Sequence, residues 1–166
     1  MVKNVFYNST SRLGLDEVIL TIKKFLDEEP EATYSLVIGT DSHEKLDSNK
    51  KKKINLVTAI VVHRKGFGGR YFWRRKVIGN IFTLRDKIYA ETIESLDFAR
   101  MFVPMVKKEL NSTIPNYNLE IHVDVGEHGE TRDMIKEVVC MVTGYGFVAK
   151  IKPDSYAASY VADRHT

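Results

Sequence analysis

Two short segments that each run directly into an aspartate constrain the fold of this chain more than any other feature. Residues 34–40 form an apolar run that ends at Asp41, and residues 119–123 alternate like a strand and end at Asp124. Between them, residues 84–110 follow helical spacing. This order predicts two parallel strands joined by a right-handed crossover. If the strands are neighbours, their carboxyl ends lie about 5 Å apart at one edge of a sheet.

The other patterns complete a mixed α/β sheet. Residues 54–63 and 70–77 are rich in β-branched or aromatic residues, and a glycine-rich turn separates them, which predicts a hairpin. We expect five strands, three antiparallel and two parallel, with helices on both faces; the further predicted elements are helices at 15–27 and 131–143, a strand at 147–151 and a last helix that starts near 153–155. The polar segment 44–53 is expected to be a solvated loop, and Pro104 is expected to kink or divide the long helix.

Length and composition favour one domain, residues 1–166, in a reducing compartment. A chain of 166 residues that is 43% apolar can bury one sizeable core. The first residues lack the apolar run of a signal peptide, and no segment approaches the roughly 18 apolar residues of a membrane span. Cys140 is the single cysteine, so no internal disulfide forms. We therefore expect a cytoplasmic protein.

Positive charge is concentrated in one part of the chain. Residues 43–76 contain eleven lysines and arginines and only two acids, although the net charge of the whole chain is only +3. Such a region is typical of a surface that holds phosphates. Within it, residues 70–76 interleave basic and aromatic side chains along a predicted strand, which predicts nucleic-acid contacts by Arg70, Arg74, Arg75 and Lys76. The alternative is a solvent-facing basic stripe whose aromatic neighbours pack inward.

The acids form the best candidate for a reactive site. Asp41 and Asp124 end the two strands, and the helix that joins these strands carries Glu91 and Glu94. Carboxylates brought this close repel one another, and burial disfavours their charged forms. A divalent cation removes both problems, and oxygen ligands favour Mg²⁺ or Mn²⁺. Two such ions can support cleavage of a phosphodiester bond.

Histidines near these acids leave another reading open. His43 follows Asp41 by two residues, and His122 precedes Asp124 by two, so each pair shares a face of its strand. With His128 as a further ligand, they are consistent with a small-molecule metallohydrolase that retains zinc. Alternatively the histidines hydrogen-bond nearby loops, or His43 or His128 assists protonation of a leaving group.

Four segments resemble the YkuK-type proteins, a bacterial family of predicted ribonuclease H-like nucleases. The similarity extends from about Phe6 to Thr166, and the terminal motif is its most specific part. The segments are IGTDSH at 38–43, HVDVG at 122–126, KPDSYAA at 152–158 and VADRHT at 161–166.

The resemblance implies a ribonuclease H-like fold with a pair of metal ions held by carboxylates. Matched by position, its four acids are Asp41, Glu91, Asp124 and Asp163. Glu94 lies one turn from Glu91 and is an alternative to it; Asp154 is an alternative to Asp163 that more readily caps the last helix.

Two departures from the better-known ribonucleases H concern substrate class more than fold. They are the long lysine-rich first loop and the sequence Asp124-Val125-Gly126, where those enzymes commonly have Asp-Ser. The expected function is a Mg²⁺- or Mn²⁺-dependent nuclease acting on RNA, DNA or a hybrid, with a silent nucleic-acid-binding or regulatory protein as the alternative.

Overall fold

The computed structural model describes residues 5–50, 52–79, 81–110 and 117–166. Its strands form one mixed sheet in the order β2-β1-β5-β4-β3-β6-β7. β3 pairs in parallel with β6, β6 pairs in parallel with β7, and the other pairs are antiparallel. The strands are β1 Val5–Tyr7, β2 Arg12–Gly14, β3 Tyr34–Leu46, β4 Lys52–Arg64, β5 Gly69–Gly79, β6 Tyr117–His122 and β7 Val148–Lys150.

The central five strands have the predicted directions, but the sheet has seven strands rather than five. The two additional ones, β1 and β2, are three residues each and extend the sheet beyond β5. Segments this short show no measurable alternation, so their pairing depends on the neighbouring strand and not on their own sequence.

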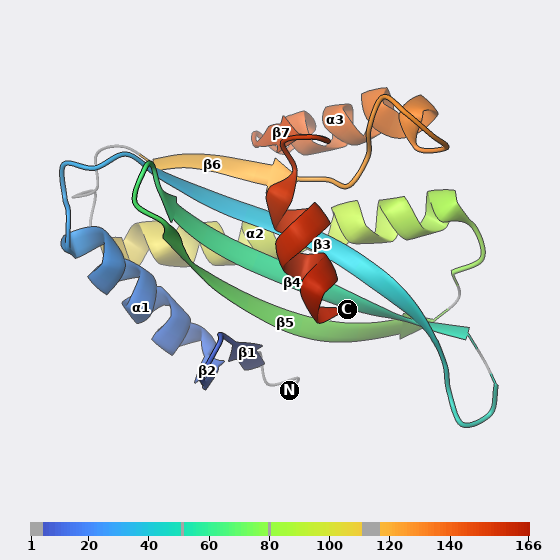
Figure 1. Ribbon diagram of the computed structural model, residues 1–166, viewed down its shortest axis with the longest axis horizontal. Helices are drawn as coiled ribbons and strands as arrows, with labels where there is room; N and C mark the ends of the chain where they lie inside the picture. Colours follow the sequence, from blue (N-terminus) through green and yellow to red (C-terminus); the bar gives the residue numbers. More distant parts are fainter. Residues whose placement is uncertain (1–4, 51, 80, 111–116) are drawn as a thin grey trace.

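Helices cover both faces of the sheet (Figure 1). The main core lies between the sheet and α1 Leu15–Asp27, α2 Leu84–Leu110 and α3 Ile135–Gly144. The opposite face is crossed by a segment that we call the terminal helix, a π-helical part Ala157–Ala162 followed by a 3₁₀ turn Asp163–His165. α2 runs unbroken through Pro104, so this proline does not divide it.

β3 and β4 extend well beyond their predicted ends. Residues 44–46 and 52–53, expected in a solvated loop, continue the antiparallel ladder as far as the pair Leu46 and Lys52. The ladder is made by backbone groups, so polar side chains do not prevent it where neighbouring strands fix its register. Asp41 therefore lies inside β3 rather than at its end, whereas Asp124 follows β6 by two residues.

The terminal helix approaches β3 most closely at Gly39. A β-carbon on Gly39 would lie 2.6 Å from the backbone nitrogen of Ala158 and 2.9 Å from the carbonyl carbon of Ala157. Real side chains do not tolerate such distances to backbone atoms, so the absence of a side chain at position 39 permits this packing.

We predict that Gly39→Ala destabilises the protein by about 1–3 kcal/mol, because the added methyl group has to displace the backbone of the terminal helix. Urea unfolding measures the change. Gly79→Ala in β5 is the matched control, since a β-carbon there meets no atom within 4 Å. Equal stability of the two variants would contradict the close packing.

Candidate metal centre

The candidate site lies where β3 loses its neighbour on one side. β6 pairs with β3 only as far as His122 opposite Gly39, while β3 continues to Leu46 against β4. From Thr40 onward, the edge of β3 that β6 had covered is open to side chains from other elements.

Asp41 faces the terminal helix. Side chains alternate along a strand, and Val37, four residues earlier, packs against Ala157 of that helix. Asp41 is only 9% exposed. Burial raises the pKa of Asp41 to about 6; the negative charges of Asp163 and Asp124 act in the same direction, and the backbone N–H of Ser42 and the charge of Lys87 oppose it.

Glu91 reaches the same edge from the opposite face of the sheet. It lies on α2 and is 2% exposed, and it accepts a hydrogen bond of 2.7 Å from Ser42 Oγ. Burial raises the pKa of Glu91 to about 8, with further contributions from Asp41 and Asp124. Lys87 Nζ lies 3.8 Å from the carboxylate and has the opposite effect, but at this distance the ion pair does not outweigh removal of the charge from water.

Asp124 and Asp163 complete the set from the terminal-helix side. Ser159 Oγ, on the terminal helix, donates a hydrogen bond of 2.6 Å to Asp124 Oδ1, and Lys152 Nζ lies 3.1 Å from the same oxygen. Asp163 is exposed in the last turn, and its charge acts on Asp41. The four acids thus come from β3, α2, the segment after β6 and the terminal helix.

The donor chemistry of these acids fits a hard divalent cation. They offer only carboxylate oxygens, and the burial of Asp41 and Glu91 and the repulsion between the acids are effects that a cation relieves. In the arrangement described, no three acidic, histidine or cysteine side chains surround one point closely enough to share an ion. Ser42 and Lys87 contact the carboxylate of Glu91, and Ser159 and Lys152 contact that of Asp124.

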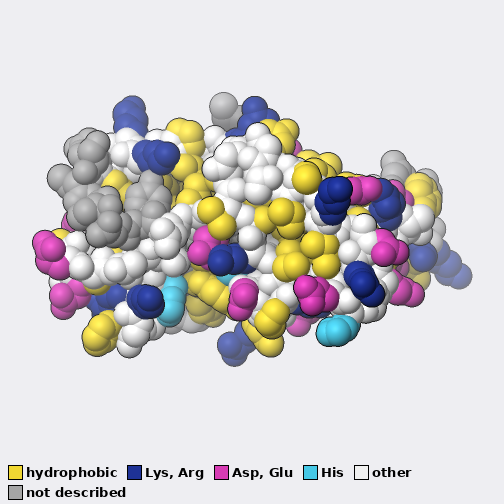
Figure 2. All heavy atoms as spheres, turned by 90° about the horizontal axis from the view of Figure 1, so that it is seen from above, with side chains coloured by type: hydrophobic (Ala, Val, Ile, Leu, Met, Phe, Trp, Pro, Cys, Tyr) yellow, Lys and Arg dark blue, Asp and Glu magenta, His cyan; other side chains and the backbone are white. Residues whose placement is uncertain are grey.

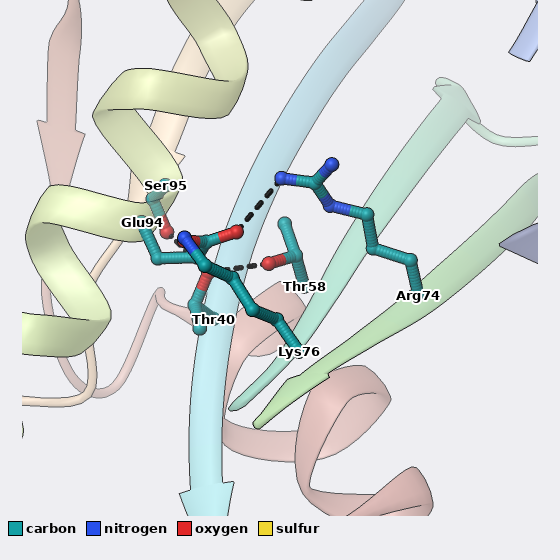
Figure 3. A network of polar contacts seen from close by, with 6 residues as sticks. All are labelled: Thr40, Thr58, Arg74, Lys76, Glu94 and Ser95. Atoms are coloured by element: carbon teal, nitrogen blue, oxygen red, sulfur yellow. Dashed lines mark hydrogen bonds and ion pairs between the residues drawn. The ribbon is translucent and has the colours of Figure 1, made fainter. Parts of the chain in front are cut away.

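Glu94, the predicted alternative to Glu91, is occupied elsewhere. Arg74 Nη2 and Lys76 Nζ donate to its two carboxylate oxygens at 2.7 and 2.5 Å (Figure 3). Beside it, Ser95 Oγ donates to Thr40 Oγ1, which donates in turn to Thr58 Oγ1. This network joins α2 to β3, β4 and β5.

The cations predicted to contact nucleic acid divide between the two faces of β5. Arg70, Arg74 and Lys76 point toward the α1 and α2 layer, where Arg70 lies over the ring of Phe25 and Arg74 over that of Phe98. The side chain of Arg74 is only 15% exposed. The sequence did not indicate which of these cations face the helices.

Arg75, on the other face, fixes the end of the terminal helix. Its guanidinium donates two hydrogen bonds to the carbonyl oxygen of His165, at 3.2 and 2.7 Å, and lies over the ring of Trp73. The His165 ring stacks on Trp73 with the ring centroids 4.5 Å apart. These contacts hold the turn that carries Asp163 against β5.

His122 has a structural role that both of its ring nitrogens serve. The backbone N–H of Ala157 donates to Nδ1 at 3.2 Å, so the proton resides on Nε2, which donates to Glu120 at 3.1 Å. Burial lowers the pKa of His122, which keeps the ring neutral. His122 therefore anchors the start of the terminal helix to β6 and offers no free nitrogen to a metal.

The other predicted alternatives are exposed. His43 lies on β3, and Asp154 lies in the segment before the terminal helix. His128 lines an open cleft of about 520 Å³ whose other residues include none of the four acids; they are Glu127, Arg132, Asp133, Ile135 and Lys136.

Sequence reasoning missed the four side chains that hold the acids. Ser42, Ser159 and Lys152 gave no periodic signal, because their partners are distant in sequence. Lys87 was detectable, since it stands four residues before Glu91 on one helix.

Comparison with known proteins assigns the chain to a family. The model of the family described as ribonuclease H-like matches residues 17–166. The uncharacterized protein YkuK of Bacillus subtilis (strain 168) is 32% identical over 176 residues, which cover 98% of this chain and 96% of that protein. No solved structure matches. The chain therefore belongs to the ribonuclease H-like family and is of YkuK type. Within the described residues, no helix is long and apolar enough to cross a lipid bilayer.

Without divalent cations, we predict that the free energy of unfolding decreases as the pH rises from about 4.5 to about 8. The pKa of Glu91 is about 8 in the folded protein and 4.5 in the unfolded reference, so between these values the folded state alone keeps the proton. Glu91→Gln removes this contribution. Urea unfolding in the presence of a chelator at several pH values should therefore show that the free energy of unfolding of the variant increases relative to that of the wild type toward pH 8. A constant difference between the two proteins across this pH range would contradict the raised pKa.

Proposed function

We propose that this ribonuclease H-like protein is a metal-dependent nuclease that hydrolyses phosphodiester bonds in nucleic acid. The observation that carries the proposal is the convergence of acids from four elements on the open edge of β3, where burial raises the pKa of both Asp41 and Glu91. Raised carboxylate pKa values with no structural ion pair strong enough to reverse them are typical of functional sites. Family membership supports the same reading.

In this proposal Asp41 and Asp124 hold Mg²⁺ or Mn²⁺, and Glu91 and Asp163 complete the ligand set for one or two ions. Such ions supply activation of a water molecule and stabilisation of the leaving oxygen. The protein supplies the placement of the acids. Asp41 lies within the paired part of β3, whereas Asp163 lies in a turn held by contacts of His165 with β5.

Lys87 and Lys152 have a second role in this proposal. Each lies beside one of the proposed metal-binding carboxylates: Lys87 Nζ is 3.8 Å from Glu91, and Lys152 Nζ is 3.1 Å from Asp124. With a cation bound to these carboxylates, the two ammonium groups would no longer be needed to neutralise them. They would then be available to attract phosphate oxygens of a bound strand as point charges.

A second candidate is a nucleic-acid-binding protein without turnover. The observation that favours it is the same pair of lysines, because Lys87 and Lys152 already partly neutralise Glu91 and Asp124 without any metal.

We predict that Asp41→Asn and Asp124→Asn abolish cleavage of labelled single-stranded, duplex and hybrid substrates in Mg²⁺ or Mn²⁺. Asparagine keeps the size of the side chain but not the charge that holds a cation. The expected loss exceeds the 10–100-fold typical of residues that only orient a metal ligand.

Asp154→Asn is the matched control, because Asp154 is an exposed acid just before the same helix and should leave the rate unchanged. Cleavage that survives Asp41→Asn would overturn the proposed site. A wild-type protein that binds these substrates without cleaving them in either metal would favour the second candidate.

A further inference from the structure

The β3–β4 hairpin continues far past the terminal helix and projects at the lower right of Figure 1. We call its outer part, with the end of β5 beside it, the wing; it comprises residues 43–46, 52–55 and 77–79. Because side chains alternate, one face of the wing is continuous with the face that carries Asp41. The side chains on that face are His43, Lys45, Lys53, Asn55 and Val77.

Two lysines face each other on this side of the wing. Lys45 and Lys53 are direct cross-strand partners, and like charges in such a position destabilise a sheet. Asp47 Oδ2 lies 3.3 Å from Lys53 Nζ and neutralises one of the two charges. Within the described residues, Lys45 forms no ion pair, so an unbalanced positive charge is maintained at a position where folding alone disfavours it.

On the opposite face of the same strands, three cations each have an acidic partner. Lys52, the sequence neighbour of Lys53, lies 3.6 Å from Glu44, and Arg74 and Lys76 both pair with Glu94. Lys45, which has no such partner among the described residues, lies on the Asp41 side, where Arg75 adds a further cation opposite Val57, the cross-strand partner of Asp41.

A shallow groove accompanies these cations. It has a volume of about 250 Å³ and is lined by Lys45, Leu46, Asp47, Lys53, Asn55, Arg75 and Val77. By contrast, the edge formed by β6, β7 and α3, which faces the viewer in Figure 2, has acidic and basic side chains beside one another.

The groove lies at a useful distance from the acids. Lys45 is four residues from Asp41 along one strand, which corresponds to about 13 Å. This length spans about four nucleotides at the ~3.4 Å axial spacing of phosphates along one strand of a duplex. A strand with its scissile phosphate at Asp41 would therefore still be in contact with the wing a few nucleotides away.

We propose that the Asp41 face of the wing binds the sugar–phosphate backbone of the nucleic-acid strand that passes through the site, with Lys45, Lys53 and Arg75 as its phosphate contacts. This inference rests on the proposed function and adds to it the path of the substrate. It assigns the contacts to a different face from Arg70, Arg74 and Lys76, whose charges are directed to the helix layer.

The test compares Lys45→Gln and Lys53→Gln with Lys52→Gln, a matched control that removes the same charge from the other face of the same strand end. Fluorescence anisotropy measures binding of labelled 15-nucleotide RNA and DNA strands in a chelator, at several salt concentrations. Lys45→Gln and Lys53→Gln should each weaken binding several-fold and reduce the log–log salt slope by about 0.7. Lys52→Gln should change neither quantity.

Thermal unfolding provides an independent reading of the same charges. Lys45→Gln should raise the unfolding midpoint, because it removes the repulsion from Lys53 while it weakens binding. A lowered midpoint together with weaker binding would mean that Lys45 serves folding, and would overturn the assignment.

Three other results would also overturn the inference. The first is an equal loss of nucleic-acid binding in Lys52→Gln and Lys53→Gln, and the second is no loss of binding in Lys45→Gln and Lys53→Gln. The third is that polyglutamate binding depends on Lys45 and Lys53 as strongly as nucleic-acid binding does. The last result would identify an acidic protein segment as the partner. If the wild type and the wing variants bind and cleave nucleic acid equally well, the inference about the wing fails and the proposed function is unaffected. If the wild type binds no nucleic-acid strand, both the inference about the wing and the proposed function fail.

Discussion

The contact between the terminal helix and the bare backbone of Gly39 positions the rest of the site. It places the helix directly on β3, so that Ser159 reaches Asp124 and the turn with Asp163 lies near Asp41. Hydrogen bonding and stacking fix the two ends of the helix: Ala157 donates to His122 of β6, and His165 stacks on Trp73 of β5. The helix thereby connects strands that are distant in the sheet, and the acids depend on its position.

Two charged features of the protein conflict with its stability. The acids at the edge of β3 are buried deeply enough that the pKa of Asp41 and of Glu91 is raised, and on the wing Lys45 faces Lys53. By contrast, the buried carboxylate of Glu94 has cationic partners in Arg74 and Lys76. Local arrangements that oppose stability are expected where function requires them, and a cation at the acids and phosphates on the wing would relieve both.

Much of the fold was predictable from the sequence, because each central strand and helix carries its own periodicity. The strands that hold Asp41 and Asp124, their parallel relation and the crossover helix with Glu91 were all found in this way. The short β1 and β2 and the polar wing were not, since they pair through backbone groups with strands supplied by the rest of the sheet. Likewise, the sequence of β5 did not indicate which of its cations face α2 and which lie on the face of Trp73.

The sequence by itself determined the type of fold and the kinds of side chain available, because these depend on local pattern and composition. Only the tertiary structure decided which acid is held by which partner, that His122 is an anchor, that Glu94 belongs to an ion-pair network, and that the unbalanced lysines share a face with Asp41. These outcomes depend on contacts between residues far apart in the chain, on burial, and on the face to which each strand turns its side chains. None of these quantities is a property of any segment alone.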